Sequence, residues 1–136
     1  MQVVLDSNVF IFAYGDPRKA SCERLIAHLI VHATTLRLGI SRNILEEVRR
    51  NINPQAHKEL WVLLNDLGVV VDENWQVPYE LGVKYEHLGL KSGDAFIAAY
   101  TEWIGADYLI TENRDFLHLV HLPFTVIKAD PFLKLR

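Results

Sequence analysis

Two short apolar runs in this chain each end at a group of polar side chains. The first run, residues 1–5, leads directly into Asp6, Ser7 and Asn8, and a second, Tyr108–Thr111, leads into another polar segment. Polar residues that follow parallel strands meet at one edge of the sheet. Carboxylates gathered there repel one another unless a divalent cation lies between them. The pattern therefore predicts an acidic, metal-binding edge on an α/β sheet.

Strands and helices are predicted to alternate along the chain, because apolar residues at helical spacing separate short apolar or β-branched runs. Strands are expected at Gln2–Leu5, Leu36–Ile40, Val69–Val71 and Tyr108–Thr111, with a last extended piece around Phe124–Ile127. Asp6–Tyr14 is expected to be a loop or short helix, and longer helices are expected from Pro17 to about His32 and at Arg42–Ile52 (with Ser41 as N-cap), Gln55–Asp66, Pro78–Leu88 and Gly93–Ile104. This alternation indicates an α/β fold with a mostly parallel sheet covered by helices.

The composition is that of a folded domain. Half of the 136 residues are hydrophobic, and the single cysteine, Cys22, excludes an internal disulfide and fits a reducing compartment. No repeat, linker or charge block divides the chain, so residues 1–136 are expected to form one domain. The apolar runs are too short for a membrane span and the N-terminus has no basic leader, which predicts a cytoplasmic protein. The net charge of −3 does not decide the partner, because cations bound to an acidic cluster would make it positive.

Four acidic residues are candidates for the predicted site. Asp6 follows the first strand, although a single acid in this place is equally consistent with a helix cap. Glu47 lies at the edge of the apolar stripe of its helix, whereas Glu46 points further toward solvent. Asp94 lies in a first helical turn, where the helix dipole already favours an acid. Asp115 follows the predicted strand that ends in Thr111 and is the weakest of the four assignments.

Two residues just before Asp115 are expected to differ in exposure. Asn113 is expected to reach the same edge of the sheet as the four acids, whereas Glu112 is expected to face solvent. Asp72 and Glu73 also follow a predicted strand, but the polar residues after them indicate an exit loop rather than a site.

Four segments of the chain resemble the motifs of the PIN domain family, in the order in which the family has them. They are Leu5–Val9, Ser41 with Leu45–Val48, Gly93–Ala99 and Leu109–Phe116. The resemblance spans nearly the whole chain and implies a PIN-like, three-layer α/β/α fold and a metal-dependent ribonuclease. The chain length suits the VapC-type toxins of prokaryotic toxin–antitoxin pairs. This implies a homodimer and a separate antitoxin protein whose tail occupies the acidic groove.

The resemblance also implies roles for individual residues. The catalytic acids would be Asp6, Glu47, Asp94 and Asp115, of which Asp6, Asp94 and Asp115 would bind metal, with polar support from Ser7, Asn8, Thr111 and Asn113. The chain departs from the family pattern at Asn113, where many relatives have Asp, so the fourth ligand is either Asp115 or partly lost. Basic residues beside the motifs are candidates for binding RNA phosphates, or else ordinary surface charges: Arg42, Arg49, Lys91 and Arg114.

Oxygen ligands without cysteine or nearby histidine favour Mg²⁺ or Mn²⁺ over zinc. One or two such ions would activate a water and neutralise charge on a phosphodiester, leaving a 3′-hydroxyl and a 5′-phosphate. Two other functions stay open at this point. A haloacid-dehalogenase-like phosphatase would need a second Asp two residues after Asp6, where this chain has Asn8. A catalytically silent PIN-like module that binds RNA or a protein is compatible with Asn113.

Overall fold

A four-stranded parallel sheet forms the centre of the computed structural model, which describes residues 1–135. The strand order is β2-β1-β3-β4, and every neighbouring pair is parallel. The strands are β1 (Gln2–Leu5), β2 (Arg37–Gly39), β3 (Tyr108–Ile110) and β4 (Thr125–Ile127). Because all strands run the same way, the residues that follow β1 and β3 lie at the same edge of the sheet. The predicted α/β class and parallel sheet are confirmed.

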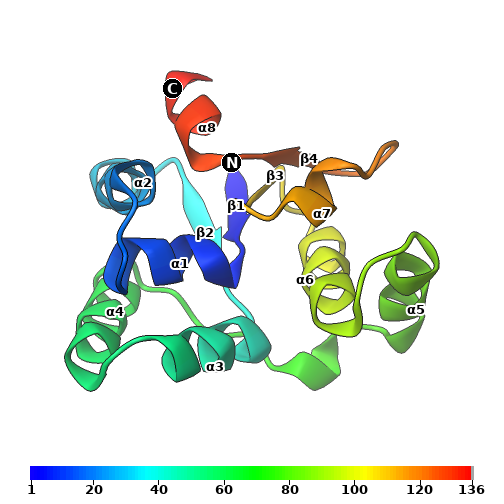
Figure 1. The fold of residues 1–136 in the computed structure, drawn as a ribbon, viewed down its shortest axis with the longest axis horizontal. Helices are drawn as coiled ribbons and strands as arrows, with labels where there is room; N and C mark the ends of the chain where they lie inside the picture. Colours follow the sequence, from blue (N-terminus) through cyan, green and yellow to red (C-terminus); the bar gives the residue numbers. More distant parts are fainter. Residues whose placement is uncertain (136) are drawn as a thin grey trace.

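Helices connect the strands and cover both sides of the sheet, as parallel crossovers require (Figure 1). They are α1 (Ser7–Tyr14), α2 (Ala20–Val31), α3 (Arg42–Asn51), α4 (Pro54–Asp66), the 3₁₀ turn η1 (Asn74–Gln76), α5 (Tyr79–His87), α6 (Ser92–Trp103), α7 (Arg114–Leu117) and α8 (Ala129–Leu135). Figure 1 shows α1, α2 and α4 on one side of the sheet and the α5–α6 pair on the other. In residues 1–135, no helix has the length and apolar character needed to span a membrane.

The core is one continuous cluster of buried apolar side chains on both faces of the sheet. Val3, Val4 and Leu5 of the central strand β1 are fully buried, which explains why this run carries no polar residue until it ends. Phe10 on α1 and Phe116 on α7 are also fully buried. They anchor the helices that follow β1 and β3, so the polar residues at those strand ends are held by rigid packing on either side.

One predicted strand does not form. Val69–Val71 is β-branched, but only the next residue, Asp72, makes a single parallel bridge, to Ser41. The backbone bonds are Asp72 N–H to Ile40 O at 2.9 Å and Arg42 N–H to Asp72 O at 2.8 Å. β2 ends at Gly39, just before this bridge, and in the described residues the pairing goes no further than Asp72. β propensity alone therefore does not make Val69–Val71 a strand.

Two helix starts also differ from expectation. The helix predicted from Pro17 begins at Ala20, because the N–H of Lys19 is bonded to the carbonyl of Phe12, at 2.8 Å, rather than within the helix. Ser41 lies at the N-cap of α3, but its hydroxyl donates to the Asn43 side chain and makes no capping bond. The short helices α7 and α8 were not predicted, because neither has enough residues to show a helical period.

A partly buried hydrogen bond joins α6 to the segment that precedes η1. Tyr100 on α6 is fully buried, and its hydroxyl donates to Asp72 Oδ2 at 2.6 Å. Burial and the neighbouring Asp72 raise the pKa of this hydroxyl, so it stays a donor. Asp72 is in turn bonded through its backbone to the start of α3. The Tyr100–Asp72 bond therefore fixes α6 relative to α3, and both helices carry candidate acids.

Removing the Tyr100 hydroxyl is expected to destabilise the fold. Tyr100→Phe should lower the free energy of unfolding by about 1–2 kcal/mol, because a half-buried carboxylate oxygen loses its donor. The measurement is urea denaturation followed by circular dichroism. Tyr79→Phe is the matched control, since Tyr79 is 81% exposed and should change stability by less than about 0.5 kcal/mol. Equal effects of the two substitutions would contradict a structural role for the bond.

Candidate active site

Asp6 is a buried carboxylate at the end of β1. Its side chain is 3% exposed. One oxygen, Oδ2, accepts the Thr111 hydroxyl at 2.7 Å, and Oδ1 accepts the Ser7 hydroxyl at 3.3 Å. Asp6 lies at the N-cap position of α1, but its side chain makes no capping hydrogen bond. The interpretation of Asp6 as a helix cap is therefore wrong, because the carboxylate turns toward the neighbouring strand end instead.

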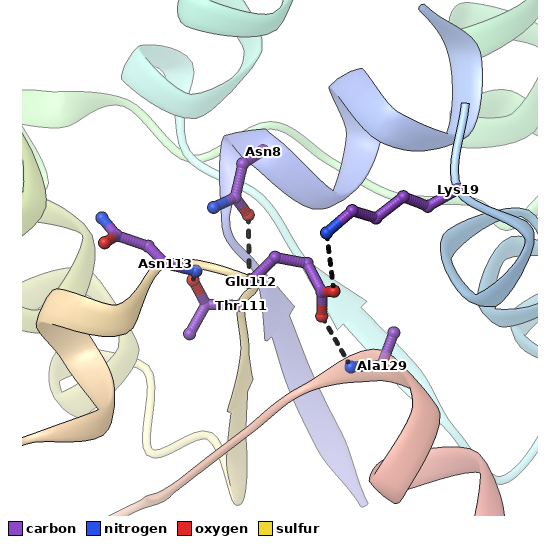
Figure 2. Close-up of polar contacts among 6 residues, drawn as sticks. All are labelled: Asn8, Lys19, Thr111, Glu112, Asn113 and Ala129. Atoms are coloured by element: carbon purple, nitrogen blue, oxygen red, sulfur yellow. Dashed lines mark hydrogen bonds and ion pairs between the residues drawn. The ribbon is translucent and has the colours of Figure 1, made fainter. Parts of the chain in front are cut away.

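Thr111 holds two parts of the site in place. It follows β3, is fully buried, and its hydroxyl oxygen accepts the backbone N–H of Asn113 at 2.9 Å while donating to Asp6. In residues 1–135, the side chain of Asn8 forms no hydrogen bond with the four acids. Its side-chain oxygen accepts the N–H of Glu112 at 3.3 Å, across the gap between α1 and the segment after β3 (Figure 2). Thr111 thus bonds to Asp6 directly, whereas Asn8 bonds to the backbone of the segment that carries Thr111 and Asn113.

Asp94 and Asn113 form a second contact at this edge. Asp94 lies in the first turn of α6, and its Oδ2 accepts the Asn113 side-chain N–H at 3.3 Å. The other side-chain atom of Asn113, Oδ1, accepts the N–H of Asp115 at 3.0 Å and so caps α7. Asp115 itself is exposed. The residue that departs from the family pattern therefore acts as a neutral donor to one candidate acid and as a helix cap.

Glu47 faces the site from α3, whereas its neighbour Glu46 does not. Glu46 forms an ion pair with Arg49 at 2.7 Å, and this contact lowers the pKa of Glu46. Glu47 is half-buried and is close enough to Asp6 and Asp94 to raise the pKa of both. Of the two glutamates, Glu47 is therefore the one whose charge acts on both Asp6 and Asp94.

Burial and neighbouring carboxylates raise the pKa of Asp6 and of Asp94. Burial raises the pKa of Asp6 from its ordinary 3.8 to about 6, and the charges of Asp94 and Glu47 add to the rise, while the bond from Thr111 opposes it. Burial also raises the pKa of Asp94, the amide of Asn113 lowers it, and the charges of Asp115 and Glu47 raise it again. The four predicted acids thus share one electrostatic field, with Asp6 at its most buried point.

The donor set suits a hard divalent cation. Every donor is an oxygen, and the mutual repulsion of the carboxylates is what a bound cation would relieve. Within residues 1–135, no three Asp, Glu, His or Cys side chains are gathered tightly enough to hold a metal ion. The residues thus fit such an ion in donor chemistry and charge, but their spacing in this structure is not that of a closed ligand cage.

The four basic candidates divide into two groups. Arg42 is paired with Glu73 at 2.9 Å and Arg49 with Glu46 at 2.7 Å, so both charges already have partners. Lys91 and Arg114 are exposed, and in the described part of the chain neither forms an ion pair. Lys91 lies near enough to lower the pKa of Asp94.

The side chain of Glu112 is less exposed than the sequence predicts. It was expected to face solvent, but its side chain is only 9% exposed and is paired with Lys19 at 3.5 Å. Figure 2 shows this side chain reaching toward Lys19 and Ala129, while Asn113 points the other way. A signal was present in the extended segment after β3, because residues 111 and 113 share a face there and residue 112 must point to the opposite one.

A comparison of the sequence with models of known protein families gives a match over most of the chain. The family model described as "PIN domain" matches residues 3–122. The chain belongs to the PIN domain family. PIN domains are generally nucleases that depend on divalent metal ions, and the acidic edge of this PIN domain lies within the matched residues.

A solved structure shares the fold of this PIN domain. A chain in the crystal structure of VapBC2 from Rickettsia felis, bound to a DNA fragment from their promoter, is similar with a TM-score of 0.65. The two chains are 19% identical, and the similarity covers 93% of this chain and 97% of the other. None of the curated protein sequences compared with this chain matches it. The structural similarity confirms a PIN-like fold over nearly the whole length of both chains.

The raised pKa of Asp6 predicts how stability depends on pH. Between its ordinary pKa of 3.8 and the folded value of about 6, the folded protein binds a proton that the unfolded chain has lost. Stability from this group therefore falls as the pH rises through that window. Asp6→Asn should be more stable than the metal-free wild type by roughly 1–3 kcal/mol at pH 7.5, and the difference should shrink toward pH 4.5.

Urea denaturation in EDTA at several pH values measures this difference. Asp66→Asn is the matched control, because Asp66 is exposed on α4 and should shift stability by less than about 0.5 kcal/mol at every pH. A constant difference between Asp6→Asn and the wild type from pH 4.5 to 7.5 would contradict the raised pKa.

Proposed function

We propose that this PIN domain is a divalent-metal-dependent endoribonuclease that hydrolyses RNA phosphodiester bonds. The observation that carries the proposal is the buried carboxylate of Asp6, whose pKa is raised to about 6 beside Asp94 and Glu47. A protein interior rarely keeps such a group without a function, because strongly perturbed acids cluster at active sites. Membership of the PIN family supports the nuclease reaction class.

The proposed roles follow from burial and contacts. Asp6 and Asp94 would hold the cation, since Asp6 is the buried acid of the four and both carboxylates are oriented by neutral donors. Glu47 and the exposed Asp115 would bind through water or orient the attacking water. Mg²⁺ or Mn²⁺ in this place would lower the pKa of a bound water and neutralise charge on the phosphate. Thr111 keeps the Asp6 carboxylate oriented throughout.

RNA binding would use the basic residues that have no acidic partner. Lys91 precedes α6 and Arg114 begins α7, so both flank Asp94 and Asp115 at the acidic edge. Phosphate contacts from such residues position a strand without reading its bases. Arg42 and Arg49 would have to leave Glu73 and Glu46 to bind phosphate, which makes them secondary candidates.

We further propose that the protein is the toxin of a type II toxin–antitoxin pair and acts in the cytoplasm as a homodimer. The support is the PIN fold that it shares, over 93% of its length, with a chain of a VapBC2 complex. The partner would be a separate antitoxin protein whose basic segment covers the acidic edge. Such a segment would supply the positive charge that the carboxylates of this edge lack.

Substitution of the buried acids tests the reaction. Asp6→Asn and Asp94→Asn should each lower Mn²⁺-dependent cleavage of a structured RNA by at least about 100-fold, because each removes a fixed charge from the proposed cation site. Cleavage is measured on gels with end-labelled RNA, and Mn²⁺ binding by calorimetric titration. Asp66→Asn should cleave as the wild type does. Equal cleavage by all variants would exclude the metal-nuclease mechanism, and a wild type without a Mn²⁺ site would favour the silent PIN-like module.

Asn113 tests whether the fourth position tunes the cation site. Asn113→Asp keeps the oxygen that caps α7 but replaces the neutral donor to Asp94 by a fifth carboxylate. We expect metal-free stability to fall by about 1 kcal/mol through like-charge repulsion, and Mn²⁺ affinity to rise by roughly tenfold. Asn113→Ser is the control, since Ser also caps a helix but adds no charge. Unchanged Mn²⁺ affinity in Asn113→Asp would place the cation away from Asp94.

A further inference from the structure

Glu112 lies between the two residues that contact the buried acids. Thr111, just before it, donates to Asp6 at 2.7 Å, and Asn113, just after it, donates to Asp94 at 3.3 Å. The Glu112 side chain points to the opposite side of the segment (Figure 2). The position of this one backbone stretch therefore decides where both donors lie.

Both oxygens of the Glu112 carboxylate are occupied by groups far away in the sequence. Oε1 pairs with Lys19 Nζ at 3.5 Å, and Oε2 accepts the backbone N–H of Ala129 at 3.1 Å. Lys19 is itself held over the ring of Phe12, with Nζ 4.5 Å from the ring centroid. The carboxylate thus connects the segment after β3 to the α1–α2 connection and to the start of α8.

The backbone of the same segment is also hydrogen-bonded to α1 and to the end of β4. The N–H of Thr111 donates to the carbonyl of Ile127 at 3.0 Å, and the N–H of Glu112 donates to Asn8 Oδ1 at 3.3 Å. Ile127 ends β4, two residues before Ala129. Two hydrogen bonds therefore hold the segment against the end of the chain. The end of β4 bonds to its backbone at Thr111, and the start of α8 bonds to the side chain of Glu112. Both contacts come from residues beyond the 3–122 that match the PIN model.

We propose that Glu112 is a positioning residue: its carboxylate, fixed by Lys19 and by the N–H of Ala129, sets Thr111 and Asn113 against Asp6 and Asp94. Among the described residues, Glu112 forms no hydrogen bond or ion pair with the proposed cation ligands, and it acts through its two neighbours. The C-terminal segment from β4 to α8 is thereby part of the support of the acidic edge. The catalytic consequence rests on the proposed nuclease function, whereas the effect on the segment itself does not.

Local hydrogen exchange tests the positioning without any substrate. Glu112→Ala should speed exchange of the Asn113 N–H, which bonds to Thr111, by roughly tenfold or more relative to Leu109 in β3. Glu112→Gln keeps an oxygen for the N–H of Ala129 and should give a smaller increase of the same kind. If Glu112→Ala does not fold, Glu112→Gln decides by the same comparison. Exchange is measured on the full chain by NMR.

Glu102→Gln is the matched control. Glu102 is another largely buried glutamate, 22% exposed, with an ion pair to Lys84 at 2.7 Å and a bond from the Tyr85 hydroxyl at 2.6 Å. It lies at the opposite end of α6 from Asp94. This substitution should change exchange at Asn113 and Leu109 by the same factor, as a loss of global stability does.

Turnover provides the second readout. In a wild type that cleaves RNA, Glu112→Ala should lower kcat by roughly 10- to 100-fold with KM within about twofold, because misplaced groups cost turnover more than binding. Equal acceleration of exchange at Asn113 and Leu109, or an unchanged kcat, would overturn the proposal. A wild type that cleaves no RNA would count against the nuclease function alone, since exchange at Asn113 still decides the position of the segment.

Discussion

The hydrogen bond from the Thr111 hydroxyl to Asp6 is the contact on which the acidic edge depends. It joins the ends of β1 and β3, the two central strands, at 2.7 Å in a buried environment. A buried carboxylate without donors would either take up a proton or unfold its surroundings. With this donor, and with Ser7 on the other oxygen, Asp6 keeps a fixed orientation although its pKa is raised to about 6.

The other acids are brought to Asp6 by parts of the chain that are remote in sequence. Asp94 and Glu47 lie on α6 and α3, and the Tyr100–Asp72 bond fixes these helices relative to each other at 2.6 Å. The single parallel bridge between Ser41 and Asp72 completes this connection. A segment too irregular to be a strand therefore still sets the distance between two helices of the site.

Most of the fold could be predicted because its signals are local. An apolar run that stops at Asp6, and a helix that opens at Asp94, are visible in a few consecutive residues. The failures concern residues whose environment is decided by distant partners. Val69–Val71 has strand composition, but in the described residues the pairing beside it is limited to the single bridge at Asp72. Glu112 resembles a surface residue in sequence, but Lys19 and the start of α8 contact it. No local pattern reveals such partners, since burial of a charge depends on tertiary contacts.

Two largely buried acids near this edge, Glu112 and Asp6, differ in the charge that faces them. The difference favours a cation supplied from outside the chain at Asp6. Glu112 is 9% exposed and has a lysine ammonium at 3.5 Å, so its charge is compensated within the protein. Asp6 is 3% exposed and, in the described part of the chain, has only neutral donors, from Thr111 and Ser7, while Asp94 and Glu47 add negative charge beside it. The chain thus brings a lysine to the carboxylate of Glu112 but, in its described part, no cationic side chain to that of Asp6. That asymmetry is expected where the positive charge comes from outside the chain, as it does for a bound metal ion.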